Sequence, residues 1–188
     1  MPTVTNVADS GKIYVKFSHT SYADVIAEYN VTVSKKSLTV TANDRTITYG
    51  DAPANSGVTI TGFVTGETAS NLAGTLSYDY SYAQYGNVGD YTITPKGYTS
   101  ANYDITYKPG KLTVGQKEVS LTWANHTGRV WGDGNTVTAT ATGMVNIDLI
   151  NVTVTGGNET AVGNYTATAT GLTGAMAVSY THLTLPTN

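Results

Sequence analysis

The chain repeats itself, and this repetition constrains its fold more than any other feature. When Lys36 is laid on Lys117, "SLTVTANDRTITYGD" (Ser37–Asp51) faces "EVSLTWANHTGRVWGD" (Glu118–Asp133), with one residue inserted in the second stretch. Further along, "TGFVTGET" matches "TGMVNIDL" and "NVGDYTIT" matches "AVGNYTAT". Self-similarity at a nearly fixed period indicates an array of similar folding units.

A partial third copy opens the chain, because residues 9–36 resemble residues 87–117. Matched positions lie roughly 74 to 82 residues apart, which suits a compact β domain. The joints "SKK" and "GQK" are short, which predicts that neighbouring modules of the chain touch end to end. We therefore predict the closing strands of a truncated module at 1–36, a complete module at 37–116, a truncated second module at 117–177 and a non-native tail at 178–188.

Short alternating segments separated by turn residues predict strands throughout the complete module. The opening strands are "LTVTA" and "RTITY", Pro95 marks a sheet edge or a strand end, and "KPGK" (Lys108–Lys111) predicts a hairpin of the last two strands. This pattern predicts an all-β fold of tandem, small immunoglobulin-like β-sandwich modules. A β-grasp-like fold is the alternative. It needs "TASNLAG" to be a true helix, whereas Gly74 leaves room for about one turn.

An aromatic residue precedes a Gly-Asp pair at the same place in two copies, as Tyr49-Gly50-Asp51 and Trp131-Gly132-Asp133. Glycine supplies a positive φ and aspartate caps neighbouring backbone, so this pattern is typical of a turn at a strand end. We interpret the aromatic side chain as a plug at the end of the core, and not as part of a ligand loop.

Composition excludes several classes of function. Charged residues make up 12% of the chain, well under the roughly 25% that is usual for a soluble domain. The net charge of −3, without a basic cluster, argues against nucleic acid and anionic membrane surfaces as partners. Cysteine is absent, and no stretch approaches the roughly 18 apolar residues of a membrane span. The opening residues lack the pattern of a signal peptide, which suggests a cytoplasmic protein or an internal piece of a longer one.

The sequence predicts no catalytic, cofactor-binding or metal-binding residues. No nucleophile motif is present, and three histidines (His19, His126 and His182) follow no ligand spacing. Five acidic residues lie in predicted turns but lack the dense spacing of a Ca²⁺ loop, so they are expected to cap turns. They are Asp44, Asp51, Glu67, Asp133 and Asp148. Asn-x-Thr triplets are read as chance matches to the glycosylation pattern in a Thr-rich chain. They begin at Asn30, Asn125, Asn151, Asn158 and Asn164.

The complete module, "LTVTANDRTITYGD…GFVTGET…GTLSYDY…NVGDYTITP…SANYDITYKPGKLTV", resembles the MBG modules of bacterial surface proteins. Residues 117–177 are similar to a sister module of such arrays. The resemblance implies an exported, wall-attached protein whose modules act as stalk or adhesive surface. It implies no cofactor and has no catalytic residues to carry over.

The last residues depart from the family pattern. After "GLTGA" the family would continue into an Asn-Tyr-x-(Leu/Ile) strand, whereas "VSYTHLTLPT" (Val178–Thr187) resembles the translation of a sequencing-library adapter. We therefore expect native protein to end near Ala177. A true strand is the alternative, because "VSYTHLTL" has some alternation.

With this resemblance, the leading prediction is a non-enzymatic structural segment, a stalk or spacer of an exported bacterial surface adhesin located outside the cell. The alternative is an adhesive module that binds host glycans or mucin through exposed tyrosines. Tyr78, Tyr80, Tyr82 and Tyr85 are the candidates, and the first three lie on one side of a predicted strand. The sequence favours the core as their location.

Overall fold

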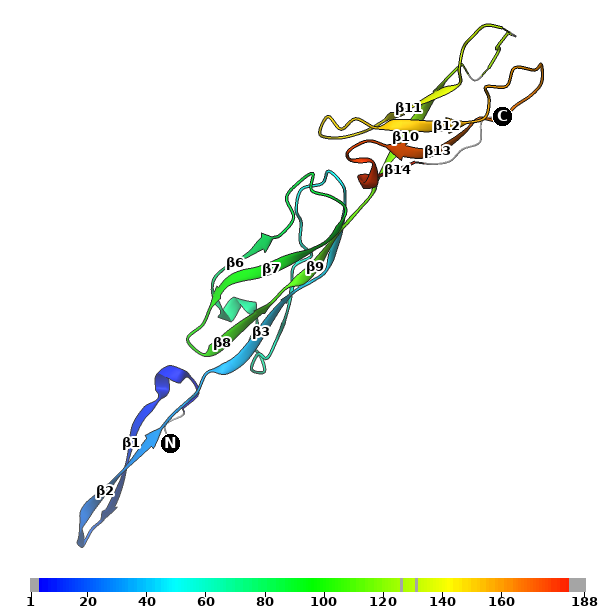
Figure 1. Cartoon of the computed structure of the whole chain (residues 1–188). Helices are drawn as coiled ribbons and strands as arrows, with labels where there is room; N and C mark the ends of the chain where they lie inside the picture. The colour runs from blue at the N-terminus through cyan, green and yellow to red at the C-terminus, as the bar shows by residue number, and fades with distance from the viewer. Residues whose placement is uncertain (1–3, 126, 131, 183–188) are drawn as a thin grey trace. The chain divides into compact units, whose positions relative to one another are not determined.

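The computed structural model describes residues 4–125, 127–130 and 132–182, and these residues form an all-β structure (Figure 1). The predicted fold class is confirmed. Helical structure in the described part is limited to 3-10 turns at Val7–Asp9, Ala69–Asn71 and Ala177–Ser179. The segment "TASNLAG" holds only the second of these turns, which Thr68 caps. The β-grasp-like alternative, which needs a full helix there, is therefore wrong.

The chain divides into two compact units. The first consists of the residues up to Asn43 together with residues 57–79 and 94–110, and the second of residues 44–56, 80–93 and those from Lys111 onward. The unit boundaries fall within strands β6 (Ala73–Tyr80) and β7 (Gly89–Thr99). The predicted module boundaries remain predictions.

The first unit begins with a hairpin of β1 (Gly11–His19) and β2 (Tyr22–Val31), paired antiparallel. Salt bridges from Lys12 to Glu28 and from Lys16 to Asp24 join the two strands. Several large apolar side chains of this hairpin are exposed, among them Tyr14, Phe17, Tyr22 and Ile26.

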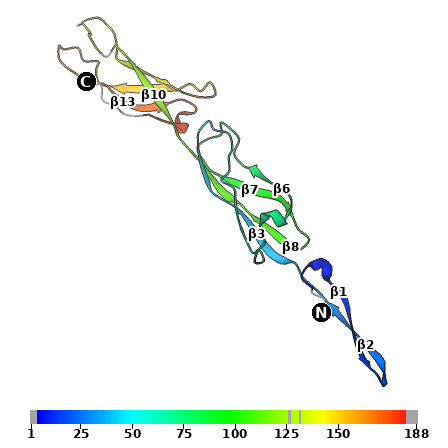
Figure 2. The same cartoon turned by 180° about the vertical axis from the view of Figure 1, so that it is seen from behind.

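The first unit also contains the three-stranded sheet β5-β3-β8, of which Figure 2 labels β3 and β8. Its central strand β3 (Lys36–Ala42) pairs antiparallel with β5 (Val58–Thr61) and parallel with β8 (Tyr103–Lys108). Leu38, Val40 and Ala42 alternate along β3 and are almost fully buried. The period of two in the sequence therefore places one face of this strand in the core.

A four-stranded sheet has the order β4-β9-β7-β6. Strand β4 (Arg45–Thr48) runs parallel to β9 (Gly110–Gly115). The buried residues of this sheet follow the same alternation and include Ile47, Ile93, Leu112 and Val114.

The predicted hairpin at Lys108–Lys111 is wrong, because β8 and β9 belong to different sheets. Only Pro109 separates the two strands, so the chain passes directly from one sheet to the other. The passage brings Gly110 against the backbone of Ala42, where a Cβ atom on Gly110 would lie 2.4 Å from the carbonyl oxygen. A side chain at position 110 would therefore clash with the backbone of β3.

Of the two places predicted for Pro95, a sheet edge or a strand end, the strand end is wrong. Pro95 is almost fully buried inside β7, which continues to Thr99. Strand β7 has 11 residues and its neighbour β9 has 6, so part of β7 has no partner on that side. A proline lacks an N–H group and is tolerated where a strand is unpaired on one side.

The remaining strands of the second unit form the sheet β13-β12-β11-β10-β14. They are β10 (Lys117–Ala124), β11 (Thr138–Thr142), β12 (Asn151–Thr155), β13 (Thr168–Thr173) and β14 (Tyr180–His182). Val119, Ala141, Ala169 and Tyr180 supply buried side chains. His126 and Trp131 lie outside the described residues.

The predicted non-native tail takes part in this sheet. Strand β14 pairs parallel with the start of β10, and Ser179 and Tyr180 are buried. Within the described residues, the buried side-chain atoms that lack a hydrogen-bond partner are Ser179 Oγ and His182 Nδ1, both in this segment. Unsatisfied buried polar atoms are expected where side chains were not selected for their surroundings. Residues 183–188 lie outside the described residues, and the adapter origin of the segment remains a prediction.

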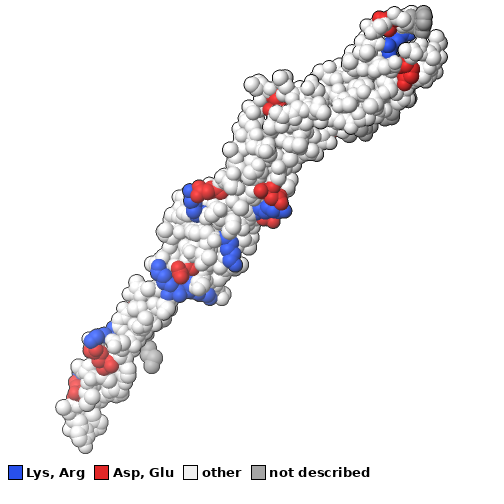
Figure 3. Space-filling model, viewed as in Figure 1, with Lys and Arg blue, Asp and Glu red and all other residues white. Residues whose placement is uncertain are grey.

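Charged residues are sparse on the face that Figure 3 shows, and several of them lie beside a residue of opposite sign. Lys96 contacts Asp79 at 2.5 Å, and Lys111 lies 3.5 Å from Asp90. Within the described residues, no helix has the length and apolarity needed to cross a membrane.

Candidate functional site

The Tyr-Gly-Asp corner at residues 49–51 is a tight turn at the end of β4. The Asp51 carboxylate accepts the Thr48 N–H group at 2.9 Å, and Gly50 has a φ of 95°. Tyr49 is 1% exposed, and its N–H group donates to the carbonyl oxygen of Gly115 at the end of β9. The predicted roles of glycine, aspartate and aromatic plug are thus confirmed for this corner.

The tyrosine of this corner also makes a long-range contact within the second unit. Its hydroxyl donates to Oδ2 of Asp148 at 2.8 Å, across 99 residues of sequence. Beside this bond, Gly50 packs so closely on Val145 that a Cβ atom at position 50 would lie 2.8 Å from Cγ2 of the valine. Glycine is therefore needed twice, for its positive φ and for this close approach.

Asp148 accepts a second tyrosine hydroxyl on the same oxygen. The Tyr180 hydroxyl donates to Oδ2 at 2.6 Å and accepts the N–H group of Val145 at 3.0 Å. The rings of Tyr49 and Tyr180 meet edge to face, with centroids 5.1 Å apart. Two phenols and one carboxylate therefore form a compact group, which we call the tyrosine–carboxylate contact.

The first unit contains the same arrangement with one tyrosine only. The Tyr103 hydroxyl donates to the Glu67 carboxylate and accepts the N–H group of Val64 at 2.9 Å. The sequence register aligns Val64 with Val145 and Glu67 with Asp148. The internal repeat is thus reproduced at the level of individual hydrogen bonds.

Two of the five acidic turn residues, Asp51 and Asp133, cap turns as predicted, and Asp133 accepts the N–H groups of Val130 and Asn135. Asp44 instead accepts the N–H group of Lys111 in β9 at 2.7 Å, across 67 residues of sequence. The hydrogen bond from the Asn135 N–H group is the main cause that lowers the pKa of Asp133.

The predicted role of a turn cap is also wrong for Glu67 and Asp148. They accept tyrosine hydroxyls from distant parts of the chain. A signal for this role exists in the sequence, because "TGFVTGE" and "TGMVNID" place valine and the acid at the same spacing in both copies.

The acidic and histidine side chains of the described residues are dispersed. No group of three His, Cys, Asp or Glu residues in that part of the chain could hold a metal ion. His19 lies at the end of β1, where its Nδ1 atom accepts the N–H group of Ser21 at 3.2 Å.

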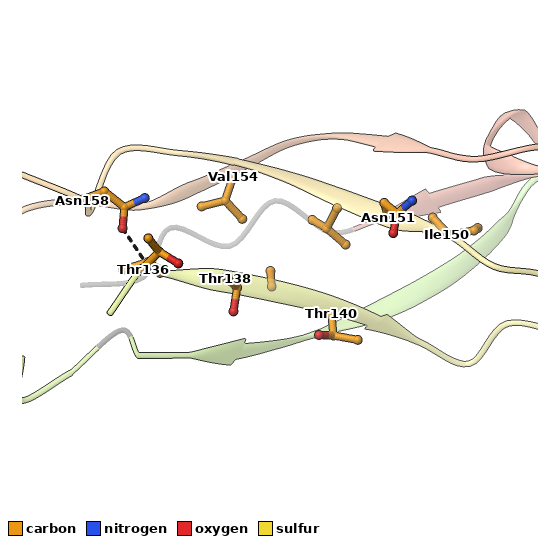
Figure 4. Close-up of a pocket in the computed structure, with 10 residues that line it drawn as sticks. Thr136, Thr138, Thr140, Ile150, Asn151, Val154 and Asn158 are labelled. Carbon is orange, nitrogen blue, oxygen red and sulfur yellow. Dashed lines mark hydrogen bonds between the residues drawn. The ribbon is translucent and has the colours of Figure 1, made fainter. Parts of the chain in front are cut away.

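A hollow of about 410 Å³ lies along β11 and β12 (Figure 4). Threonine, valine, isoleucine, alanine and asparagine side chains line it, and Asn158 accepts the N–H group of Val137 at 2.8 Å. No ionisable residue is among the lining residues. These described residues therefore offer the hollow threonine hydroxyls and asparagine amides, and no side chain among them titrates as a general acid or base.

The four tyrosines proposed as a sugar-binding platform do not form an exposed face. Tyr82 is 3% exposed, Tyr78 and Tyr80 are half-buried, and only Tyr85 is exposed. The Tyr80 hydroxyl accepts a hydrogen bond from Asn55 at 2.8 Å. The predicted period of two is present, and it directs the first three rings toward the interior, which was the favoured interpretation.

Burial dominates the acid–base behaviour of the tyrosine–carboxylate contact. Desolvation, followed by the hydrogen bond to Asp148, raises the pKa of Tyr49 well above its usual value of 10. The same two causes raise the pKa of Tyr180 to about 12. Both phenols therefore remain protonated donors at neutral pH.

Removing the Tyr49 hydroxyl is expected to loosen this contact. In Tyr49→Phe the ring is retained while Asp148 loses one donor, which should cost about 2 kcal/mol because the acceptor is charged. Hydrogen exchange of the Tyr49 backbone amide reports the local opening. In a double-mutant cycle, Asp148→Asn should reduce the effect of Tyr49→Phe by at least half. Additive effects of the two substitutions would contradict the assignment.

Alkaline pH should remove the same stabilisation. The folded-state pKa of Tyr49 is raised, so its contribution is complete below pH 10 and is lost as the pH rises above the unfolded-state pKa. The stability difference between the native chain and Tyr49→Phe should thus shrink by about 1.4 kcal/mol between pH 9 and pH 11. Thermal unfolding followed by circular dichroism measures this difference. A constant difference would show that Tyr49 does not titrate in this way.

Comparison with known proteins agrees with these features. Residues 38–113 match the family model of the MBG domain (YGX type), which confirms the resemblance seen in the sequence. The MBG domain is a non-catalytic module of bacterial surface proteins. None of the curated proteins compared with the chain matches it.

Proposed function

We propose that this chain, whose residues 38–113 match the MBG domain model, is a stalk or spacer segment of an exported bacterial surface adhesin. Its role is mechanical: β modules joined in series hold other parts of the adhesin away from the cell wall. Its partners are the neighbouring modules of the same chain.

The tyrosine–carboxylate contact is the observation that carries this proposal. It joins the corner that follows β4 to the turn that precedes β12. Only Gln116 separates β9 from β10. A joint of one residue, with the hydrogen bond from Tyr49 to Asp148 beside it, resists bending more than a long flexible linker would.

The test varies the number of modules in an anchored chain. Extra copies of residues 36–116 are inserted after Gln116, and the chain is displayed between a cell-wall anchor and an epitope. Under this proposal the distance from the wall to the epitope grows linearly with copy number. Growth with the square root of copy number, as for a flexible chain, would contradict it.

A binding screen provides the second arm of the test. The full chain is applied to a glycan array and to immobilised mucin, where no specific binding is expected. Saturable binding that survives high salt would support the adhesive alternative instead. Tyr85→Ala, at the one exposed tyrosine of the proposed platform, would then show whether that residue takes part.

A further inference from the structure

Two surfaces that match in the sequence repeat, Val145 with Asp148 and Val64 with Glu67, differ in which residues cover them. At the first, Val145 is half-buried beneath Gly50, and Asp148 holds two tyrosine hydroxyls. At the second, Val64 is 49% exposed, and Glu67 accepts the hydroxyl of Tyr103. The second surface thus has the same acceptor and the same valine as the first.

The chain reaches both surfaces through a short joint ahead of the matched lysine of the repeat. Gln116 alone separates β9 from β10, which begins at Lys117. Lys35, directly before Lys36, donates through Nζ to the carbonyl oxygen of Ser100 at 3.1 Å, in the turn between β7 and β8. The two joints occupy matching places in the repeat, and the covering corner is the part that differs.

The position of a covering corner follows from the repeat. The N–H group of Tyr49 donates to Gly115, two residues ahead of Lys117. The equivalent position ahead of Lys36 is Ser34. A corner paired with Ser34 would lie beside the joint at Lys35 and Lys36, as the Tyr49 corner lies beside Gln116. Residues 1–36 contain no aromatic-Gly-Asp sequence that could supply it.

We propose that Val64 and Glu67 form a docking surface for the aromatic-Gly-Asp corner of a preceding module of the same type. The tyrosine hydroxyl of that corner donates to Glu67, and its glycine packs on Val64. The partner is thus a module like residues 37–116, joined in the same chain ahead of Lys36. This inference rests on the proposed function and names the contact by which successive modules dock.

The absence of cysteine from the chain allows a direct test by thiol labelling. A second copy of residues 36–116 is inserted after Gln116, so that Tyr49 of the first copy precedes Glu67 of the second. Val64→Cys is then made in either copy, and the rate of reaction with a small maleimide is measured. The two sites have identical sequence surroundings within the module, and only the second copy has a preceding Tyr49 corner.

We expect the thiol at position 64 of the second copy to react about tenfold more slowly than the thiol in the first copy. Tyr49→Phe in the first copy, or Glu67→Gln in the second, should restore at least a third of the difference. Tyr49→Phe in the second copy is the matched control and should leave both rates unchanged. Val145→Cys in the unextended chain gives the rate for a covered site.

Equal labelling rates in the two copies would overturn the inference, as would a rate difference insensitive to both Tyr49→Phe and Glu67→Gln. Circular dichroism of each variant verifies that it is folded. Failure here is distinct from failure of the spacer role. Equal rates with linear growth of length would leave the spacer proposal standing, whereas square-root growth would refute that proposal whatever the labelling rates.

Discussion

Replacing Leu112 with alanine is expected to lower the free energy of unfolding by about 3 kcal/mol. Leu112 lies in β9 and is 0% exposed, so the substitution removes buried methyl groups and leaves a cavity among the side chains of the core. Strand β9 is hydrogen-bonded to a neighbouring strand on each side, β4 and β7, which limits how far the backbone can move to fill the space. Urea denaturation followed by circular dichroism measures the loss.

Leu149→Ala is the matched control for this prediction. It removes the same atoms from a leucine that is 84% exposed, and it should change the free energy of unfolding by less than about 0.5 kcal/mol. Similar effects of the two substitutions would mean that Leu112 is not part of a closely packed core.

Replacing Gly97 with alanine is expected to be at least as damaging, with a loss of about 3 kcal/mol. Gly97 has a φ of 103°, a conformation that side chains rarely adopt. An added Cβ atom would also lie 2.0 Å from the carbonyl oxygen of Thr75 in the neighbouring strand β6. Both effects act on the backbone, so rotation of a side chain cannot relieve them.

Gly171→Ala in β13 separates this effect from the general consequence of adding a methyl group. Gly171 has no atom within 4 Å of its ideal Cβ position and is not in the left-handed region. We expect a change within about 0.5 kcal/mol. If Gly97→Ala proved equally mild, the close pairing of β6 and β7 at this point would be refuted.

Features that depend on neighbouring residues were predictable from the sequence. The alternation of Leu38, Val40 and Ala42 places a strand with one buried face, because successive side chains of any strand point to opposite sides. The caps made by Asp51 and Asp133 follow from turn chemistry within four residues. Such features need no knowledge of the rest of the chain.

Features that depend on the path of the chain were predicted less well. The "KPGK" turn has the composition of a hairpin, yet β8 and β9 pair with different strands in different sheets. The choice is made by β3, which pairs parallel with β8, and by β4, which pairs parallel with β9. Their paired residues, such as Lys36 with Tyr103 and Arg45 with Leu112, are 67 positions apart. Turn composition alone contains no information about those edges.

The candidate site also combines features set by local sequence with one contact set by the path of the chain. By itself the sequence determined that the chain is a β-rich repeat, that its corners are Gly-Asp turns, and that Tyr49 is a core residue, because each of these depends on local patterns or on their recurrence. Only the tertiary structure decided that the Tyr49 hydroxyl binds Asp148, 99 residues away. A hydrogen bond requires two atoms to meet within about 3 Å, and only the folded chain brings such distant residues to that separation.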